Sequence, residues 1–108
     1  MSRNALLFVV LVGCSPGADP CVPMCAQAAE VYGECLEGEW DTDWAAAGYD
    51  DAADFASGCE TYTWELRLLD EDAGGDGTSV DAMCRDRDRV LDSLSCDEWT
   101  ELTWDDTP

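Results

Sequence analysis

The sequence predicts an all-α fold: a small, disulfide-stapled three-helix bundle, up-down-up in topology, that follows a signal peptide. Three observations lead to this prediction. Apolar residues recur at helical spacing in three separate stretches. Connections rich in Gly and Asp divide these stretches. Seven cysteines lie in a chain of 108 residues, and a domain of this size has a small core that disulfides commonly reinforce.

The chain begins with an apolar run from Ala5 to Val12, behind the single basic residue Arg3. A membrane-spanning helix needs about 20 apolar residues, so the run fits the short apolar core of a signal peptide better. The sequence LVGC, Leu11 to Cys14, resembles the lipobox of bacterial lipoproteins. The resemblance implies that residues 1–13 are a signal peptide and that Cys14 is lipidated and becomes the first residue of the mature protein.

The resemblance also predicts where the protein resides. In Gram-negative lipoproteins an Asp after the lipidated cysteine retains the protein in the inner membrane, whereas this chain has Ser15. We therefore expect a lipid-anchored protein of the bacterial cell envelope, in the outer membrane and facing the periplasm or the cell surface. Residues 14–20 would form the lipidated cysteine and a flexible tether, since they contain Pro and Gly. The alternatives are an ordinary secretory leader and an apolar N-terminal helix in which the Cys occurs by chance.

The odd number of cysteines has an explanation if one of them is lipidated. With Cys14 assigned to the lipid, six remain, and six cysteines in a small exported domain predict three disulfides. The alternative is a cytosolic thiolate metal site, because the spacing of Cys21 and Cys25 also occurs in structural zinc sites.

The disulfide-stapled domain, residues 21–96, is expected to begin with a helix at Cys21 that Gly38 ends. Residues 39–51 then form a connection. The apolar face of this first helix consists of residues at helical spacing: Cys21, Cys25, Ala28, Ala29, Tyr32, Cys35 and Leu36.

A second helix is expected after Asp50 or Asp51, either of which can cap it. Gly58 lies inside this helix and weakens it, and the Gly-rich stretch 70–79 ends it. Its apolar stripe steps by four, three, four and three residues: Phe55, Cys59, Tyr62, Leu66 and Leu69.

A third helix is expected to begin at the cap Ser79. Residues 85–89, RDRDR, should face mostly outward, and Asp81 and Arg85 have the spacing of an ion pair. After this helix, residues 97–108 read as an acidic tail that frays. The inward stripe of the helix is Val80, Met83, Cys84, Arg87, Leu91 and Leu94.

The heights of the cysteines along an up-down-up bundle predict how they pair. A helix rises about 1.5 Å per residue. This rise places Cys21 of the first helix at the same height as Cys84 of the third helix. It likewise places Cys35 and Cys96 at the same height, near the other end of the bundle. The remaining two then pair across the middle. Out of the 15 connectivities that six cysteines allow, the expected pairs are Cys21–Cys84, Cys25–Cys59 and Cys35–Cys96.

Charge and composition exclude several function classes. The chain has 25 acidic residues, 5 basic residues and no His, so we expect no nucleic-acid partner, since such binding needs Lys and Arg to neutralise phosphates. The lack of His excludes Ser-His-Asp and Cys-His catalysis. Adjacent carboxylates, such as Asp50 with Asp51 or Asp105 with Asp106, arise by chance in so acidic a chain, and we expect no enzyme.

The stretch 70–81 is similar to a degenerate EF-hand loop, which places acidic oxygens at its positions 1, 3 and 5, Gly at 6 and Glu at 12. Two residues depart from this pattern: Gly74 offers no side-chain ligand, and the last position holds Asp instead of the longer Glu. Calcium is thus the one candidate cofactor, and calcium binding is the alternative function. The candidate ligands are Asp70, Asp72, Asp76, Thr78 and Asp81.

Five Trp in so small a chain suggest either stacking on a sugar or a partner, or a small aromatic core. We favour the core, with Trp40, Trp44 and Trp64 covering it and Trp99 and Trp104 packed back against it. The expected function is therefore a lipid-anchored envelope protein that acts as a small binding or structural module without catalysis. Its partners would be the membrane, through the lipid, and an envelope protein or a glycan.

Overall fold

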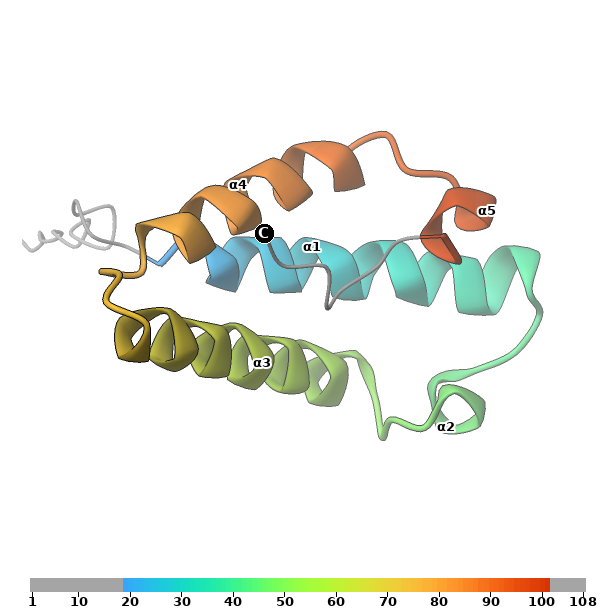
Figure 1. The fold of residues 1–108 in the computed structure, drawn as a ribbon. Helices are drawn as coiled ribbons and strands as arrows, with labels where there is room; N and C mark the ends of the chain where they lie inside the picture. Colours follow the sequence, from blue (N-terminus) through green and yellow to red (C-terminus); the bar gives the residue numbers. More distant parts are fainter. Residues whose placement is uncertain (1–18, 102–108) are drawn as a thin grey trace, which may run out of the picture.

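The computed structural model describes residues 19–101, and within this range every regular element is helical (Figure 1). The expected signal peptide, Cys14 and Trp104 lie outside the described residues. The elements are, in chain order, α1 (Cys21–Glu34), the π-helical segment η2 (Cys35–Glu39), α2 (Trp44–Ala47), α3 (Ala52–Asp72), α4 (Thr78–Leu91) and α5 (Cys96–Trp99).

The three long helices form the bundle that the sequence predicts. In Figure 1, α1 and α4 run in one direction and α3 runs in the opposite direction, so the up-down-up topology is confirmed. The two short helices, α2 and α5, lie at the end of the bundle where α1 continues into η2. Within residues 19–101 no helix has both the length and the apolar character needed to cross a membrane.

The core centres on α1, which contacts both α3 and α4. Ala28 and Ala29 are buried on its inward face, and their small side chains allow the neighbouring helices to approach closely. Val80, Cys84 and Leu91 of α4 belong to the same buried cluster as Ala28. The predicted apolar face of the first helix is confirmed by burial, with Tyr32 half-buried at its edge; the deeply buried Met24 was not predicted.

Three disulfides join the helices, and their pairs are the ones expected from the cysteine heights. Their Cα–Cα distances are 4.9, 5.7 and 5.6 Å, within the usual range for such bonds. One ties α1 to α4, one ties α1 to α3 and one ties η2 to α5. In that order they are Cys21–Cys84, Cys25–Cys59 and Cys35–Cys96.

The end of the first helix differs from the prediction. Gly38 does not stop the helix but lies inside η2, where the chain widens into a π-helical turn. The backbone N–H of Trp40 donates to the carbonyl of Cys35 at 2.8 Å, and the same turn carries the cysteine that bonds to α5. Cys35, which bonds to Cys96 of α5, is therefore the first residue of the π turn.

Of the two candidate caps for α3, Asp51 is the one used, since its carboxylate accepts the N–H of Asp54 at 2.8 Å. The prediction that Ser79 caps the third helix is wrong. Helix α4 begins at Thr78, after Gly77 with φ of 88°, and the Asp76 carboxylate accepts the Thr78 N–H at 3.1 Å. A positive φ is accessible to Gly without strain, so the chain turns into the helix earlier than the sequence pattern indicates.

One prediction about burial and one about the C-terminal segment are wrong. Leu69, the last member of the α3 stripe, is 64% exposed. Residues 97–99 belong to α5 and not to a fraying tail, and Trp99, only 8% exposed, packs against the core as expected. Ser95 and Glu98 cap this helix reciprocally, which fixes the short segment against the bundle.

Candidate functional site

An aromatic cluster fills the end of the bundle near η2, and Tyr32 of α1 lies at its centre. The ring centroid of Tyr32 is 4.8 Å from that of Trp99, 5.2 Å from that of Trp44 and 5.3 Å from that of Phe55. A Cβ added at Gly33 would lie 3.1 Å from the Trp44 ring, so this glycine lets α2 approach α1. The cluster joins α1, α2, α3 and α5 through contacts between rings.

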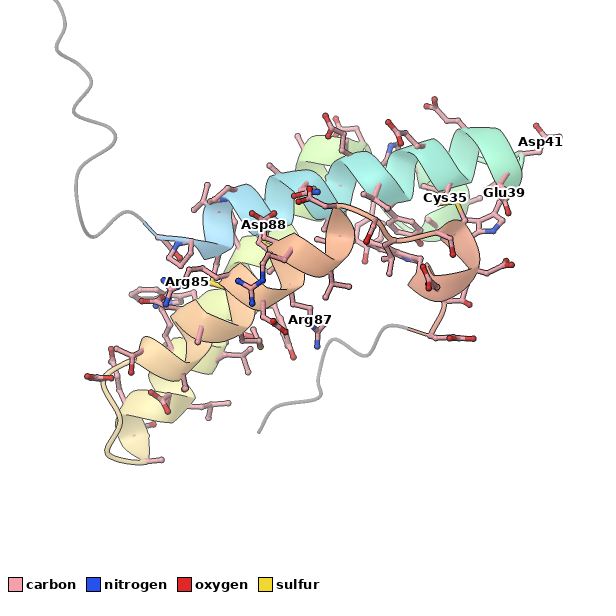
Figure 2. All side chains as sticks on the ribbon, turned by 90° about the horizontal axis from the view of Figure 1, so that it is seen from above. Cys35, Glu39, Asp41, Arg85, Arg87 and Asp88 are labelled. Carbon is pink, nitrogen blue, oxygen red and sulfur yellow. A yellow bond between two sulfur atoms is a disulfide. The ribbon has the colours of Figure 1, made fainter. Side chains whose placement is uncertain are left out.

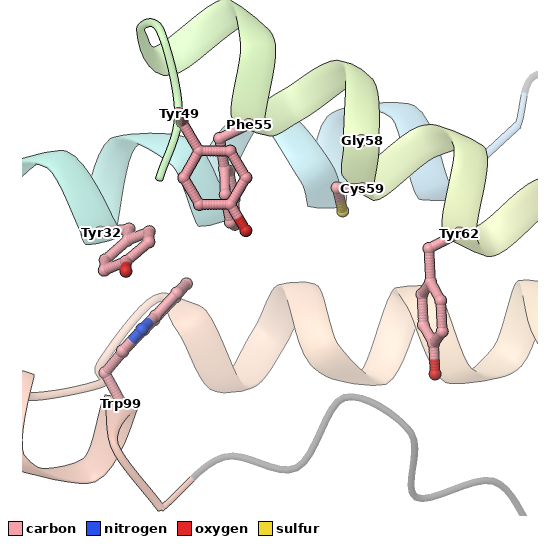
Figure 3. A pocket seen from close by; sticks show the side chains of 7 residues that line it. All are labelled: Tyr32, Tyr49, Phe55, Gly58, Cys59, Tyr62 and Trp99. Carbon is pink, nitrogen blue, oxygen red and sulfur yellow. The ribbon is translucent and has the colours of Figure 1, made fainter. Parts of the chain in front are cut away.

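Beside this cluster the structure has a cavity of about 370 Å³, within the size range of small-molecule pockets. Figure 3 shows Tyr32, Tyr49, Phe55 and Trp99 at one end of it and Tyr62 at the other, with Gly58 and Cys59 between them. The lining residues come from α1, α3, α5 and the segment before α3: Tyr32, Tyr49, Phe55, Gly58, Cys59, Tyr62 and Trp99.

The α3 wall of the cavity follows from helical spacing. Phe55, Cys59 and Tyr62 are separated by four and three residues and share one face. Gly58 adjoins this face, and a Cβ added there would meet no atom within 4 Å. The wall is therefore aromatic at both ends and open in the middle.

The polar side-chain groups of the lining are the phenol hydroxyls of its three Tyr residues and the indole N–H of Trp99. Burial raises the pKa of Tyr32 above 10.0, with a smaller contribution from nearby Tyr49, so the phenol stays neutral at physiological pH. The lining contains no carboxylate, amide or guanidinium. The chemistry of this site is binding through ring faces and hydroxyl groups, and within the lining no group is suited to act as a base near neutral pH.

The opposite end of the bundle is closed by Arg67 of α3, whose side chain is 15% exposed. Its guanidinium binds Asp19, just before α1, and Asp81 of α4, each at 2.5 Å. These contacts raise the pKa of Arg67 despite its partial burial, and the hydrogen bond to Asp81 is the strongest of them. The prediction that Asp81 pairs with Arg85 is therefore wrong. The α3–α4 turn places Arg67 next to Asp81, and Asp81 pairs with Arg67 instead.

Asp19, Cys21 and Asp81 form the one group of three metal-ligand side chains that lie within 4.8 Å of one another in residues 19–101. The guanidinium of Arg67 already forms ion pairs with both carboxylates. The sulfur of Cys21 is bonded to Cys84, so it is no thiolate. This group is a counter-ion shell for Arg67, and the alternative of a thiolate metal site at Cys21 and Cys25 is excluded by their disulfides.

The candidate calcium ligands do not lie on one continuous loop. Asp70 and Asp72 belong to the last turn of α3, while Thr78 and Asp81 belong to α4. Only residues 73–77 connect the two helices. No three of the candidate carboxylates lie within ligand distance of one another in the described part of the chain.

The carboxylate of Asp70 instead organises this turn. It accepts the N–H of Gly77 at 2.8 Å and the hydroxyl of Ser79 at 3.3 Å. A Cβ added at Gly75 would collide with the Asp70 carboxylate. The glycine at this position therefore makes room for that carboxylate, whereas in an EF-hand loop it would allow the sharp turn at position 6. Thr78 is likewise engaged, since its N–H and hydroxyl both donate to Asp76.

The Trp residues separate into two groups. Trp40, Trp44 and Trp99 belong to the aromatic cluster, as the core interpretation predicts. Trp64 does not cover the core: it is 59% exposed on the outer side of α3.

The sequence did not single out two residues of these sites. Arg67 forms the ion pairs with Asp19 and Asp81, and Tyr49 lines the cavity. The glycine at position 58, inside a helix with an apolar stripe, was the available sign of a cavity.

Acidic side chains project from the bundle along its whole length (Figure 2). Within the RDRDR stretch, Arg85 and Arg89 are exposed, whereas Arg87 and Asp88 are partly buried. Comparison with models of known protein families, with curated proteins and with solved structures gives no match.

Proposed function

We propose that this protein is a small binding module that a lipid on Cys14 holds at a bacterial envelope membrane. The cysteine pairing carries the proposal. The three disulfides use six of the seven cysteines, so Cys14 has no cysteine of this chain left to pair with. Lipidation accounts for that remaining cysteine, and three disulfides are typical of an exported domain.

The aromatic cavity supports a binding role over a purely structural one. The pocket of about 370 Å³ has a volume within the range of small-molecule sites, and its lining is mostly aromatic, as is common for such sites.

A comparison of the wild type with Cys14→Ser, expressed in a Gram-negative host, tests the proposal. The wild type should sediment with membranes, begin at residue 14 and carry the added mass of acyl chains. Cys14→Ser should carry no acyl mass and should retain the leader, while its three disulfides form normally.

Ser15→Ala is the matched control, because it changes a neighbouring small residue and leaves the thiol in place; it should be processed like the wild type. If Cys14→Ser is processed and localised like the wild type, the anchor is not on Cys14 and the proposal fails.

A further inference from the structure

We propose that the aromatic cavity binds small organic cations that carry a methylated ammonium group, such as choline. The inference rests on the proposed binding function only in that the domain binds a ligand, and it adds the chemical class of that ligand. The negative faces of aromatic rings attract a quaternary ammonium, and cages of several rings are an established way to hold one.

The arrangement of the rings fits a compact cation better than a flat ligand. The planes of Tyr49 and Phe55 meet at 83° with centroids 5.1 Å apart, and those of Tyr32 and Phe55 meet at 65° with centroids 5.3 Å apart. The rings at this end of the pocket thus face in different directions, with Tyr62 at the opposite end (Figure 3). A sugar would need a flat platform with carboxylates or amides to bind its hydroxyls, and the lining offers neither amide nor carboxylate.

The charge of the protein favours a cationic ligand. The formal net charge is −20, and the chain has neither Lys nor His, so its field attracts cations and repels anions. Carboxylates also adjoin the lining in sequence without entering it. Three of them, all exposed, stand next to Tyr49, Phe55 and Trp99 respectively: Asp50, Asp54 and Glu98.

Gly58 supplies an independent observation. Glycine is an unfavourable residue in the interior of a helix, yet Gly58 lies well within α3. Its position is not forced by crowding, because an added Cβ would meet no atom within 4 Å. A side chain at this position would instead reduce the open middle of the cavity, so the glycine maintains the space in which a ligand would sit.

The first experiment is calorimetric titration of the full protein with choline and with 3,3-dimethylbutan-1-ol, its neutral carbon isostere. We expect choline to bind one site per chain with a Kd of about 1 mM or tighter. The isostere should bind at least about tenfold more weakly, because it has the same shape but no charge for the ring faces to attract. Equal affinities would overturn the proposal, as would the absence of choline binding at about 10 mM.

Two variants test the location of the site. Gly58→Leu should fill the cavity, and Phe55→Leu should remove one ring while keeping an apolar side chain; each should weaken choline binding about tenfold or more. Trp64→Leu is the matched control, since it removes an exposed ring on the same helix and should leave the Kd unchanged. Thermal melting of each variant verifies folding, and a folded Gly58→Leu that binds choline normally would contradict the proposal.

The same ammonium group can come from a free cation or from a phosphocholine lipid headgroup. Titration with soluble dihexanoyl phosphatidylcholine distinguishes them: tighter binding than choline assigns the headgroup, and weaker binding assigns the free cation. If glucose binds in the cavity and choline does not, the site is a sugar site and the inference is wrong. These titrations do not depend on the anchor, so their failure is separate from any failure of Cys14 lipidation.

Discussion

The two ends of the bundle are closed by different chemistry. At one end, which we call the ion-pair end, Arg67 binds Asp19 and Asp81 beside the Cys21–Cys84 disulfide. At the other, the aromatic end, rings from four elements gather around Tyr32 beside the Cys35–Cys96 disulfide. Ion pairs close the ion-pair end. At the aromatic end, the packed rings leave a cavity beside them.

The connections at the two ends explain part of this difference. Residues 73–77 join α3 to α4 at the ion-pair end through a short turn that Asp70 organises. At the aromatic end the chain takes longer paths, through α2 and α5, which bring in additional rings. The short turn of residues 73–77 fixes how α3 and α4 meet, whereas the longer segments at the aromatic end leave space for a binding site.

Removal of a disulfide gives the largest expected effect and compares the ends directly. Cys21–Cys84 and Cys35–Cys96 span similar sequence separations, 63 and 61 residues. Replacement of either pair by Ser should therefore lower the free energy of unfolding by about 4 kcal/mol. Urea denaturation followed by circular dichroism measures both losses. A loss below about 1 kcal/mol at one end only would show that its disulfide does not restrain the folded domain.

Replacement of the central residue of the ion-pair end gives the next largest effect. Arg67→Met should cost about 2 kcal/mol, because it leaves the half-buried carboxylate of Asp81 and the exposed one of Asp19 without their counter-ion. Arg89→Met is the matched control: its pair with Asp86 is exposed to solvent on both sides, and its loss should cost less than about 0.5 kcal/mol. Thermal denaturation of both variants tests the difference, and equal costs would show that Arg67 does not hold this end together.

The turn between α3 and α4 should depend on Asp70. Asp70→Ala removes the acceptor of the Gly77 N–H and should cost about 1 kcal/mol, whereas Asp72→Ala, which changes an exposed carboxylate two residues on, should cost almost nothing. The same two variants address calcium. If the Asp70 carboxylate is occupied by its hydrogen bonds within the turn, millimolar calcium should not raise the melting temperature of the wild type. A rise in the wild type that is absent from both variants would instead indicate that the loop binds calcium.

The smallest effect concerns the α5 cap at the aromatic end. The N–H of Ser95 donates to Glu98 and lowers the pKa of this carboxyl below 4.5. A carboxyl with a lower pKa in the folded state stabilises the fold above its unfolded pKa, and this contribution is lost as the pH falls through the folded value. The NMR signal of the Trp99 indole should therefore shift below about pH 4.5. Glu98→Gln should remove that step, and an unchanged step would assign it to another carboxyl.

Much of the scaffold could be predicted because its determinants are regular along the chain. Apolar spacing places the helices, and a constant rise per residue places cysteines such as Cys25 and Cys59 at matching heights. The ion-pair end could not be predicted in this way. Asp81 has Arg85 at helical spacing, and only the geometry of the turn brings Arg67 closer.

The candidate site was predicted less completely for a physical reason. Its lining combines Tyr32, Phe55 and Trp99 from three elements, and their meeting depends on the angles at which α2 and α5 close onto the bundle. Periodicity within one helix carries no information about those angles. The sequence places Gly58 inside the α3 helix, but only the structure shows that this glycine lines a cavity.

The most direct test of the account is the unreduced mass of the protein extracted from membranes, measured with and without an alkylating agent. The account predicts a chain that begins at Cys14, carries acyl mass and takes up no alkylating agent, since all other cysteines are paired. Proteolysis without reduction should then release linked peptides for Cys21–Cys84, Cys25–Cys59 and Cys35–Cys96. A chain that retains Met1 or Ser2, with several cysteines alkylated, would contradict both the anchor and the stapled fold.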